Sequence, residues 1–185
     1  SPAAINPLRI ALRVGAILAG ACFCVPLHYL WKLFRLRPIW PQVFLGYVGR
    51  CAGVRVRTEG QPLQGSALLA ANHVSWLDIL VLGGASRAHF VAKDEVRDWP
   101  AIGWLAGLNE TIYVARHARG TVQHQADSLR EALADGRVVG LFPEGTTDGG
   151  GALLPFRASL FASLYPPLPG VRVQPVALDY GPATD

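Results

Sequence analysis

The stretch SALLAANHVSWLDIL, residues 66–80, joins a short apolar run to a segment with helical spacing. The run SALLAAN ends at the polar Asn72, and its length and composition predict a buried strand. Ser75 and Asp78 have the S-x-x-D spacing of a capping box, which predicts a helix from Ser75 to Gly83. A buried strand followed at once by a helix is the unit from which α/β domains are built.

The chain after Gly53 repeats this unit, because short β-rich runs alternate with helical stretches. The predicted fold class is therefore α/β, with helices flanking a sheet. We expect further strands at VRVRT (54–58), HFVAK (89–93), TIYVAR (111–116), VVGLFP (138–143) and VRVQPVAL (171–178). We expect further helices at residues 100–108, 121–134 and 158–164.

Positive charge and apolar residues are concentrated at the start of the chain. Residues 1–58 hold eight Lys and Arg and no acid, whereas the remainder holds nine basic and thirteen acidic residues. The run Val14–Trp31 has no Lys, Arg, Asp or Glu, and as a helix it would reach ~27 Å, close to the thickness of a bilayer core. A second apolar stretch, Pro38–Gly49, follows. This pattern predicts a helical hairpin that dips into one leaflet of an anionic membrane, and it predicts no binding to nucleic acid.

A second interpretation of this leader is a secretory signal, because LAGAC, residues 18–22, loosely resembles a lipoprotein cleavage box. The apolar stretch that follows favours the hairpin. The chain has three cysteines, two of them inside the first apolar run, and we interpret them as small buried hydrophobes. We therefore predict that they form no disulfide and bind no metal, and we separately expect no cofactor.

Two interpretations fit His73 and Asp78, which lie five positions apart at the junction of the predicted strand and helix. If Ser75 is the N-cap, the Asp78 carboxylate turns back toward the helix N-terminus, where His73 lies. That carboxylate would either cap backbone N–H groups or orient the imidazole of a general base. A second motif favours catalysis, because FPEGTTDGG, residues 142–150, follows a buried strand, and ligand sites of α/β sheets lie at that end.

The combination of NHxxxxD, about seventy residues and then FPEGT resembles the phospholipid/glycerol acyltransferase family. The resemblance runs from about Leu68 to Leu178, with YVAR (113–116) similar to the second block and VQPVAL (173–178) similar to the fourth. It implies a mixed sheet flanked by helices, and transfer of a fatty acyl group from acyl-CoA or acyl carrier protein to a lysolipid hydroxyl. It further implies a role in membrane lipid biosynthesis at the cytoplasmic face of a bacterial inner membrane.

The resemblance also implies roles for single residues. His73 would deprotonate the acceptor hydroxyl, and Asp78 would orient the imidazole of His73. Arg116 of the second block is associated with the acceptor phosphate. The remaining predicted substrate-binding residues are Glu144, Gly145, Thr146 and Arg157. Backbone N–H groups near Gly145 are candidate donors to an oxyanion or a phosphate.

One departure from the family pattern bears on the acceptor. Family members that read phosphate often carry a Lys-rich stretch after the third block, whereas this chain has PFRAS at residues 155–159. The expected acceptor is of the 1-acylglycerol-3-phosphate type. The alternative is a lyso-ornithine lipid, because the EGTTDGG and LPFRASLF version of the motif resembles that branch.

We expect two domains, a membrane-associated hairpin at residues 1–53 and a catalytic domain at residues 54–185. Family members usually continue beyond the fourth block, so part of the acceptor pocket is expected to lie beyond Asp185. Two other functions remain open. One is a thioester or ester hydrolase that uses His73 and Asp78 to activate water, and the other is a non-catalytic lipid-binding protein.

Overall fold

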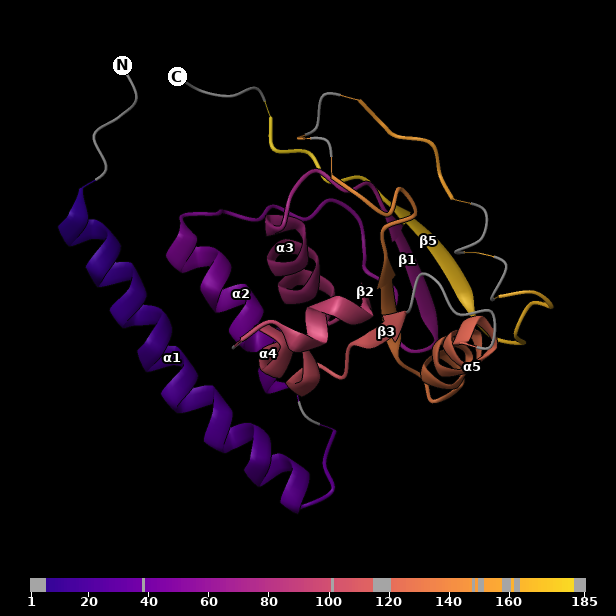
Figure 1. Ribbon diagram of the computed structural model, residues 1–185, viewed down its shortest axis with the longest axis horizontal. Coiled ribbons are helices and arrows are strands. Elements are labelled where there is room, and N and C mark those ends of the chain that lie inside the picture. The colour runs from indigo at the N-terminus through magenta and orange to yellow at the C-terminus, as the bar shows by residue number, and fades with distance from the viewer. Residues whose placement is uncertain are drawn as a thin grey trace.

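The computed structural model describes residues 6–37, 39–100, 102–114, 121–147, 149, 152–157, 161 and 164–181. Its strands are β1 (Ala67–Ala71), β2 (His89–Lys93), β3 (Ile112–Val114), β4 (Val138–Leu141) and β5 (Arg172–Val176). Its α-helices are α1 (Pro7–Leu33), α2 (Trp40–Ala52), α3 (Leu77–Ser86), α4 (Ile102–Leu108) and α5 (Thr121–Ala134), and a short 3₁₀ helix, η1, spans Asp94–Asp98. The strands and helices alternate from β1 to β4, as the sequence predicts for an α/β domain (Figure 1).

The five strands form one sheet in the order β3-β2-β4-β1-β5, and every described pair is parallel. The expected α/β class is confirmed, but the expectation of a mixed sheet is wrong for the described strands. Helix α3 connects β1 to β2, α4 lies between β2 and β3, and α5 connects β3 to β4. Each connection crosses back over the sheet, so that the next strand runs in the same direction. All five carboxyl ends therefore meet at one edge of the sheet.

The predicted strand at 54–58 is also wrong, because this segment has no strand partner among the described residues. The place beside β1 is taken by β5. The neighbouring residues 61–63 are instead tied to β5 by the Gln174 side chain, which accepts from Leu63 N at 2.9 Å and donates to Gln61 O at 3.0 Å.

Apolar residues fill both faces of the sheet, because alternate residues of β1 point to opposite sides. Leu69 packs with Leu82 of α3 and Phe90 of β2 on one face. Leu68 packs with Leu129 and Leu133 of α5 on the other face. Figure 1 shows the resulting layers, with α5 on one side of the sheet and α3 and α2 on the other.

The expected N-terminal helical hairpin is present as α1 and α2. Helix α1 begins at Pro7, where the Asn6 side chain caps the first turn, and it runs for 27 residues. The two helices pack closely, because Gly20 leaves room for the Tyr47 ring and Tyr47 Oη donates to Ala16 O at 2.9 Å. Helix α2 then packs on α3 at Gly46 and Gly84, where an added Cβ would meet the opposite backbone.

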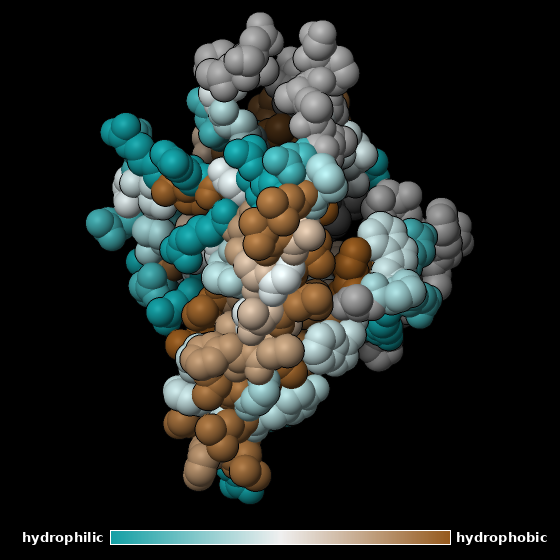
Figure 2. Space-filling model, turned by 90° about the vertical axis from the view of Figure 1, so that its left-hand side faces the viewer, coloured by the Kyte–Doolittle hydropathy of each residue, from teal (hydrophilic) through white to brown (hydrophobic). Residues whose placement is uncertain are grey.

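The outer side of α1 is apolar and exposed. Among the described helices, α1 alone is long and apolar enough to cross a bilayer. Its exposed side chains include Leu12, Leu18 and Phe23, and Figure 2 shows apolar side chains gathered on the face that α1 presents. This helix therefore exposes a large apolar surface that has no partner among the residues that the structure describes.

Several other predicted elements agree with the structure. The strand at 89–93 and the helix at 121–134 are confirmed with the bounds expected. The helix predicted from Ser75 begins two residues later, at Leu77. The helix predicted at 158–164 lies largely outside the described residues.

Candidate active site

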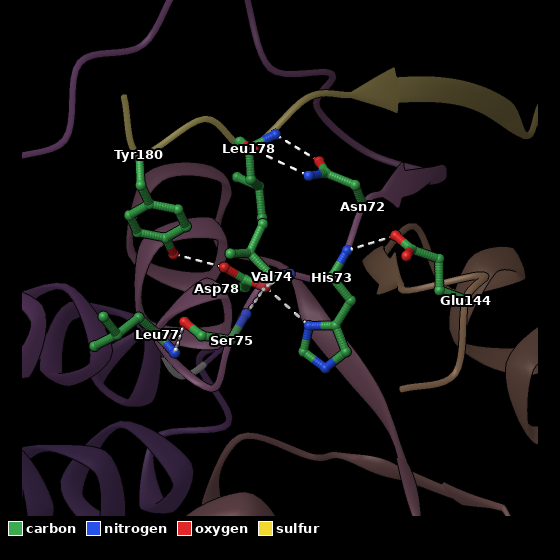
Figure 3. A network of polar contacts seen from close by, with 9 residues as sticks. All are labelled: Asn72, His73, Val74, Ser75, Leu77, Asp78, Glu144, Leu178 and Tyr180. Carbon is green, nitrogen blue, oxygen red and sulfur yellow. Dashed lines mark hydrogen bonds and ion pairs between the residues drawn. The ribbon is translucent and has the colours of Figure 1, made fainter. Parts of the chain in front are cut away.

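The candidate site lies at the carboxyl edge of the sheet, where three neighbouring strands end. Asn72 and His73 follow β1, Glu144 lies in the loop after β4, and Tyr180 lies in the segment after β5 (Figure 3). Because β1 lies between β4 and β5, residues far apart in the sequence meet here. Glu144 lies 71 positions after His73, and Tyr180 lies 102 positions after Asp78. Ligand sites of parallel α/β sheets lie at this edge.

Asp78 performs both of the tasks that the sequence left open. Its Oδ2 accepts from His73 Nδ1 at 2.9 Å, and also from the backbone N–H groups of Val74 at 2.6 Å and Ser75 at 2.9 Å. Its Oδ1 accepts from Tyr180 Oη at 2.6 Å. The helix-capping interpretation and the imidazole-orienting interpretation therefore describe the same carboxylate.

Asp78 is fully buried, which by itself favours the neutral acid. Burial raises the pKa of this carboxyl, but the hydrogen bonds from His73, Tyr180, Ser75 and Val74 together outweigh it and leave the pKa below the ordinary value. The charged form is favoured because each of these donors points at a carboxylate oxygen. The site therefore holds a buried negative charge beside the imidazole.

The imidazole of His73 is held on two sides. Its Nδ1 faces Asp78, so the bound tautomer carries its proton on Nδ1 and leaves a lone pair on Nε2. The ring stacks on Phe142, with centroids 4.1 Å apart and planes 15° apart, and Phe142 is itself stacked on Phe90. Figure 3 shows the Nε2 edge turned away from Asp78, and the His73 side chain is 17% exposed. The geometry is that of an oriented imidazole whose Nε2 has no hydrogen-bond partner within the described part of the chain.

Glu144 secures the backbone that carries this imidazole. Its Oε1 accepts from His73 N at 2.8 Å, and its Oε2 accepts from Leu154 N at 2.9 Å. The residue is 3% exposed. The substrate-binding role predicted for Glu144 stays a prediction, whereas the contacts observed are both with the protein backbone.

Two residues of the site, Asn72 and Tyr180, were not among the predicted site residues. Asn72 forms two hydrogen bonds with Leu178, donating from Nδ2 to its carbonyl at 2.9 Å and accepting from its N–H at 2.6 Å. This pairing fastens the segment after β5 to the end of β1 and brings Tyr180 onto Asp78. Asn72 stands in the NHxxxxD motif itself, but no sequence signal marked Tyr180.

The other predicted binding residues are placed as follows. Gly145 adopts a left-handed backbone (φ 67°), and its own N–H donates to Phe142 O at 3.0 Å. The role predicted for the backbone N–H groups near Gly145 stays a prediction. Thr146 is exposed. Arg157 is exposed, and its side chain lies against Gly145, where an added Cβ would be 3.1 Å from Arg157 Nε. Arg116 lies outside the described residues.

With the fold and this site in view, comparison with known proteins places the chain in a family. Residues 53–179 match the sequence profile of the family described as Acyltransferase. The chain belongs to this acyltransferase family.

The chain is similar to named members of the family. It is 39% identical over 186 residues to the lyso-ornithine lipid O-acyltransferase of Brucella abortus, covering 95% of this chain and 69% of that protein. It is 36% identical over 128 residues to the 1-acyl-sn-glycerol-3-phosphate acyltransferase of Neisseria gonorrhoeae, covering 69% of this chain and 49% of that protein.

A solved structure supports the fold. The 1-acyl-sn-glycerophosphate acyltransferase of Thermotoga maritima matches with a TM-score of 0.51 at 22% identity, over 84% of this chain and 70% of that one. The chain thus shares its fold with an acyltransferase of known structure.

Proposed function

We propose that this chain transfers a fatty acyl group from an acyl-CoA or acyl carrier protein thioester to the free hydroxyl of a lysolipid. One observation carries the proposal: His73 Nδ1 lies 2.9 Å from a buried carboxylate, and Nε2 faces away from it. An imidazole held in this way is suited to take a proton from an alcohol. Membership of the acyltransferase family supports the same reaction.

In the proposed reaction, His73 Nε2 takes the proton of the acceptor hydroxyl as its oxygen attacks the thioester carbonyl. A C–O bond forms, the C–S bond breaks, and the imidazolium returns its proton to the leaving thiolate. Asp78 keeps the imidazole in one tautomer and stabilises the imidazolium between the two proton transfers. The chemistry requires no nucleophile from the protein and no metal.

We propose a lyso-ornithine lipid as the acceptor, rather than the 1-acylglycerol-3-phosphate first expected from the motifs. The relative named for lyso-ornithine lipid matches over 95% of this chain. The stretch PFRAS keeps one cation, Arg157, where phosphate-reading members often carry a Lys-rich stretch. Arg157 lies against Gly145 in the third motif, and its guanidinium is suited to a carboxylate head group.

We further propose that α1 holds the catalytic domain at the cytoplasmic face of a bacterial inner membrane. The apolar surface of α1 supports membrane attachment. The eight basic residues of the first 58 favour anionic lipids as neighbours. A lysolipid acceptor is itself a membrane component, so this attachment brings enzyme and acceptor to one surface.

The test is acyl transfer by the purified chain. Labelled acyl-CoA and acyl carrier protein are offered with lyso-ornithine lipid and with 1-acylglycerol-3-phosphate, and the products are separated by head group. We expect a labelled ornithine lipid, with His73→Gln as the inactive control. Free fatty acid as the sole product would identify a hydrolase, and absence of any turnover would favour a lipid-binding protein.

A further inference from the structure

Tyr180 lies after β5, outside the motifs that first marked the site, yet its hydroxyl contacts the buried carboxylate. Tyr180 Oη lies 2.6 Å from Asp78 Oδ1, and the two residues are 102 positions apart. We infer that Tyr180 is a positioning residue that sets how strongly Asp78 attracts the protonated form of His73. This inference rests on the proposed function, in which His73 is the base.

The two oxygens of Asp78 are served from different parts of the chain. Oδ2 accepts from three local donors, His73 Nδ1, Val74 N and Ser75 N. Among the described residues, the donor to Oδ1 is Tyr180. The local donors fix the carboxylate beside the imidazole, and Tyr180 adds a donor to the other carboxylate oxygen.

The hydroxyl of Tyr180 is a donor across the working pH range. Burial, together with the hydrogen bond to Asp78, raises the pKa of Tyr180 well above its ordinary value, so the phenol stays protonated. Its O–H dipole therefore points its positive end at the Asp78 carboxylate. That dipole stabilises the negative charge and weakens the pull of the carboxylate on the imidazolium of His73.

Removal of the hydroxyl has a predictable sign. Without this donor, the Asp78 charge acts more strongly on His73, so the imidazolium is favoured up to a higher pH. A base must be neutral to take a proton, and the acid limb of the rate profile therefore moves to higher pH. A residue that only supported the fold would lower stability and leave this limb in place.

Tyr180→Phe removes no charge, so we expect the other charged groups around the site to stay as they are. Arg55, Arg57 and Glu59 line the same pocket as Tyr180. Glu144, from the loop after β4, bonds through both oxygens to backbone N–H groups. Asp179, beside Tyr180, accepts from Gly181 N at 2.8 Å. Arg157 lies against Gly145, and Asp78 is the one charged residue of α3. A shift in the titration of His73 therefore reports on the Tyr180 hydroxyl.

The experiment is an NMR titration of the full chain in detergent with ¹⁵N-labelled histidine, using wild type and Tyr180→Phe. The His73 resonance is assigned by its loss in His73→Gln. We expect its titration midpoint to rise by roughly 0.5–1 pH unit in Tyr180→Phe, which is part of what a hydrogen bond to a charged group contributes, because the hydroxyl acts on His73 only through Asp78. Tyr165→Phe is the matched control, because Tyr165 is 82% exposed and its replacement is expected to leave the midpoint unchanged.

Tyr180→Leu removes the ring as well as the hydroxyl, so it shows whether the retained ring of Tyr180→Phe has an effect of its own. We expect the His73 midpoint to rise in this variant too. A midpoint unchanged in both variants overturns the inference, even if the melting temperature falls. In kinetics, the acid limb of kcat/KM is expected to move by the same amount with the acceptor KM unchanged. The titration needs no substrate, so a shifted midpoint in a chain without acyl transfer would refute the proposed function and uphold the role of Tyr180.

Discussion

The contacts of Glu144 predict that Glu144→Gln destabilises the fold and slows the reaction without weakening substrate binding. The carboxylate receives the N–H of His73 at 2.8 Å and of Leu154 at 2.9 Å, and the residue is 3% exposed. A Gln amide has one accepting oxygen, and its NH₂ group would face the second N–H. One buried donor therefore loses its acceptor, and the bond that remains loses its charge.

The magnitude follows from these two bonds. A buried donor left without a partner costs about 1–3 kcal/mol, and the loss of charge on the second bond adds roughly 1 kcal/mol, so we expect about 2–4 kcal/mol. For a chain of this length that lowers the melting temperature by roughly 5–15 °C. Because Glu144 holds the backbone of His73, we expect kcat to fall about tenfold or more.

The assay combines thermal unfolding in detergent with steady-state kinetics for donor and acceptor. The control is Glu59→Gln, which makes the same chemical change at an exposed residue that forms an exposed ion pair with Arg57, and it should leave both measurements close to wild type. A variant with wild-type melting temperature and a raised KM for either substrate would refute the reasoning. That result would assign Glu144 to substrate binding instead.

Three further predictions concern the proposed base, its carboxylate partner and the proposed membrane helix. His73→Ala should lower kcat about a hundredfold or more while the circular dichroism spectrum stays that of wild type, and near-normal turnover would contradict the mechanism. Asp78→Asn should be less stable than wild type above about pH 4. That deficit should shrink as the pH falls through the lowered pKa of Asp78, because the ionised form then no longer stabilises wild type; chemical denaturation at several pH values measures it. Replacing Leu12, Leu18 and Phe23, which α1 exposes, with Asn should lower binding to phosphatidylglycerol vesicles by at least about a hundredfold, since each buried apolar side chain contributes roughly 1.5–3 kcal/mol. Unchanged sedimentation with the vesicles would show that α1 is not the anchor.

The local features of this protein were predictable because they depend on residues close together in the sequence. The run SALLAAN and the Ser75–Asp78 spacing predicted β1 and α3, and the structure confirms both. The spacing of His73 and Asp78 likewise placed the two side chains within reach, since His73 lies in the short link after β1 and Asp78 lies in the first turn of α3. The sequence did not decide whether Asp78 caps the helix or orients the imidazole. In the structure, Asp78 Oδ2 accepts both from the backbone N–H groups and from His73 Nδ1.

The misjudged features depend on which strands become neighbours. VRVRT has the alternation of a strand, but β5 occupies the edge beside β1, and that segment has no strand partner among the residues described. The direction of the strands depends in the same way on where each connecting helix packs, so the parallel sheet was not evident from periodicity.

The sequence by itself determined the α/β class, the apolar leader and the His73–Asp78 pair, because each arises from composition, periodicity or short-range spacing. Only the tertiary structure decided what surrounds that pair. Glu144 reaches the His73 backbone, and Tyr180 reaches Asp78, because β4 and β5 lie on either side of β1 with their carboxyl ends at one edge. These two hydrogen bonds, which span 71 and 102 sequence positions, follow from this order of strands. The order is set by the packing of the whole chain and leaves no periodic signal in the sequence.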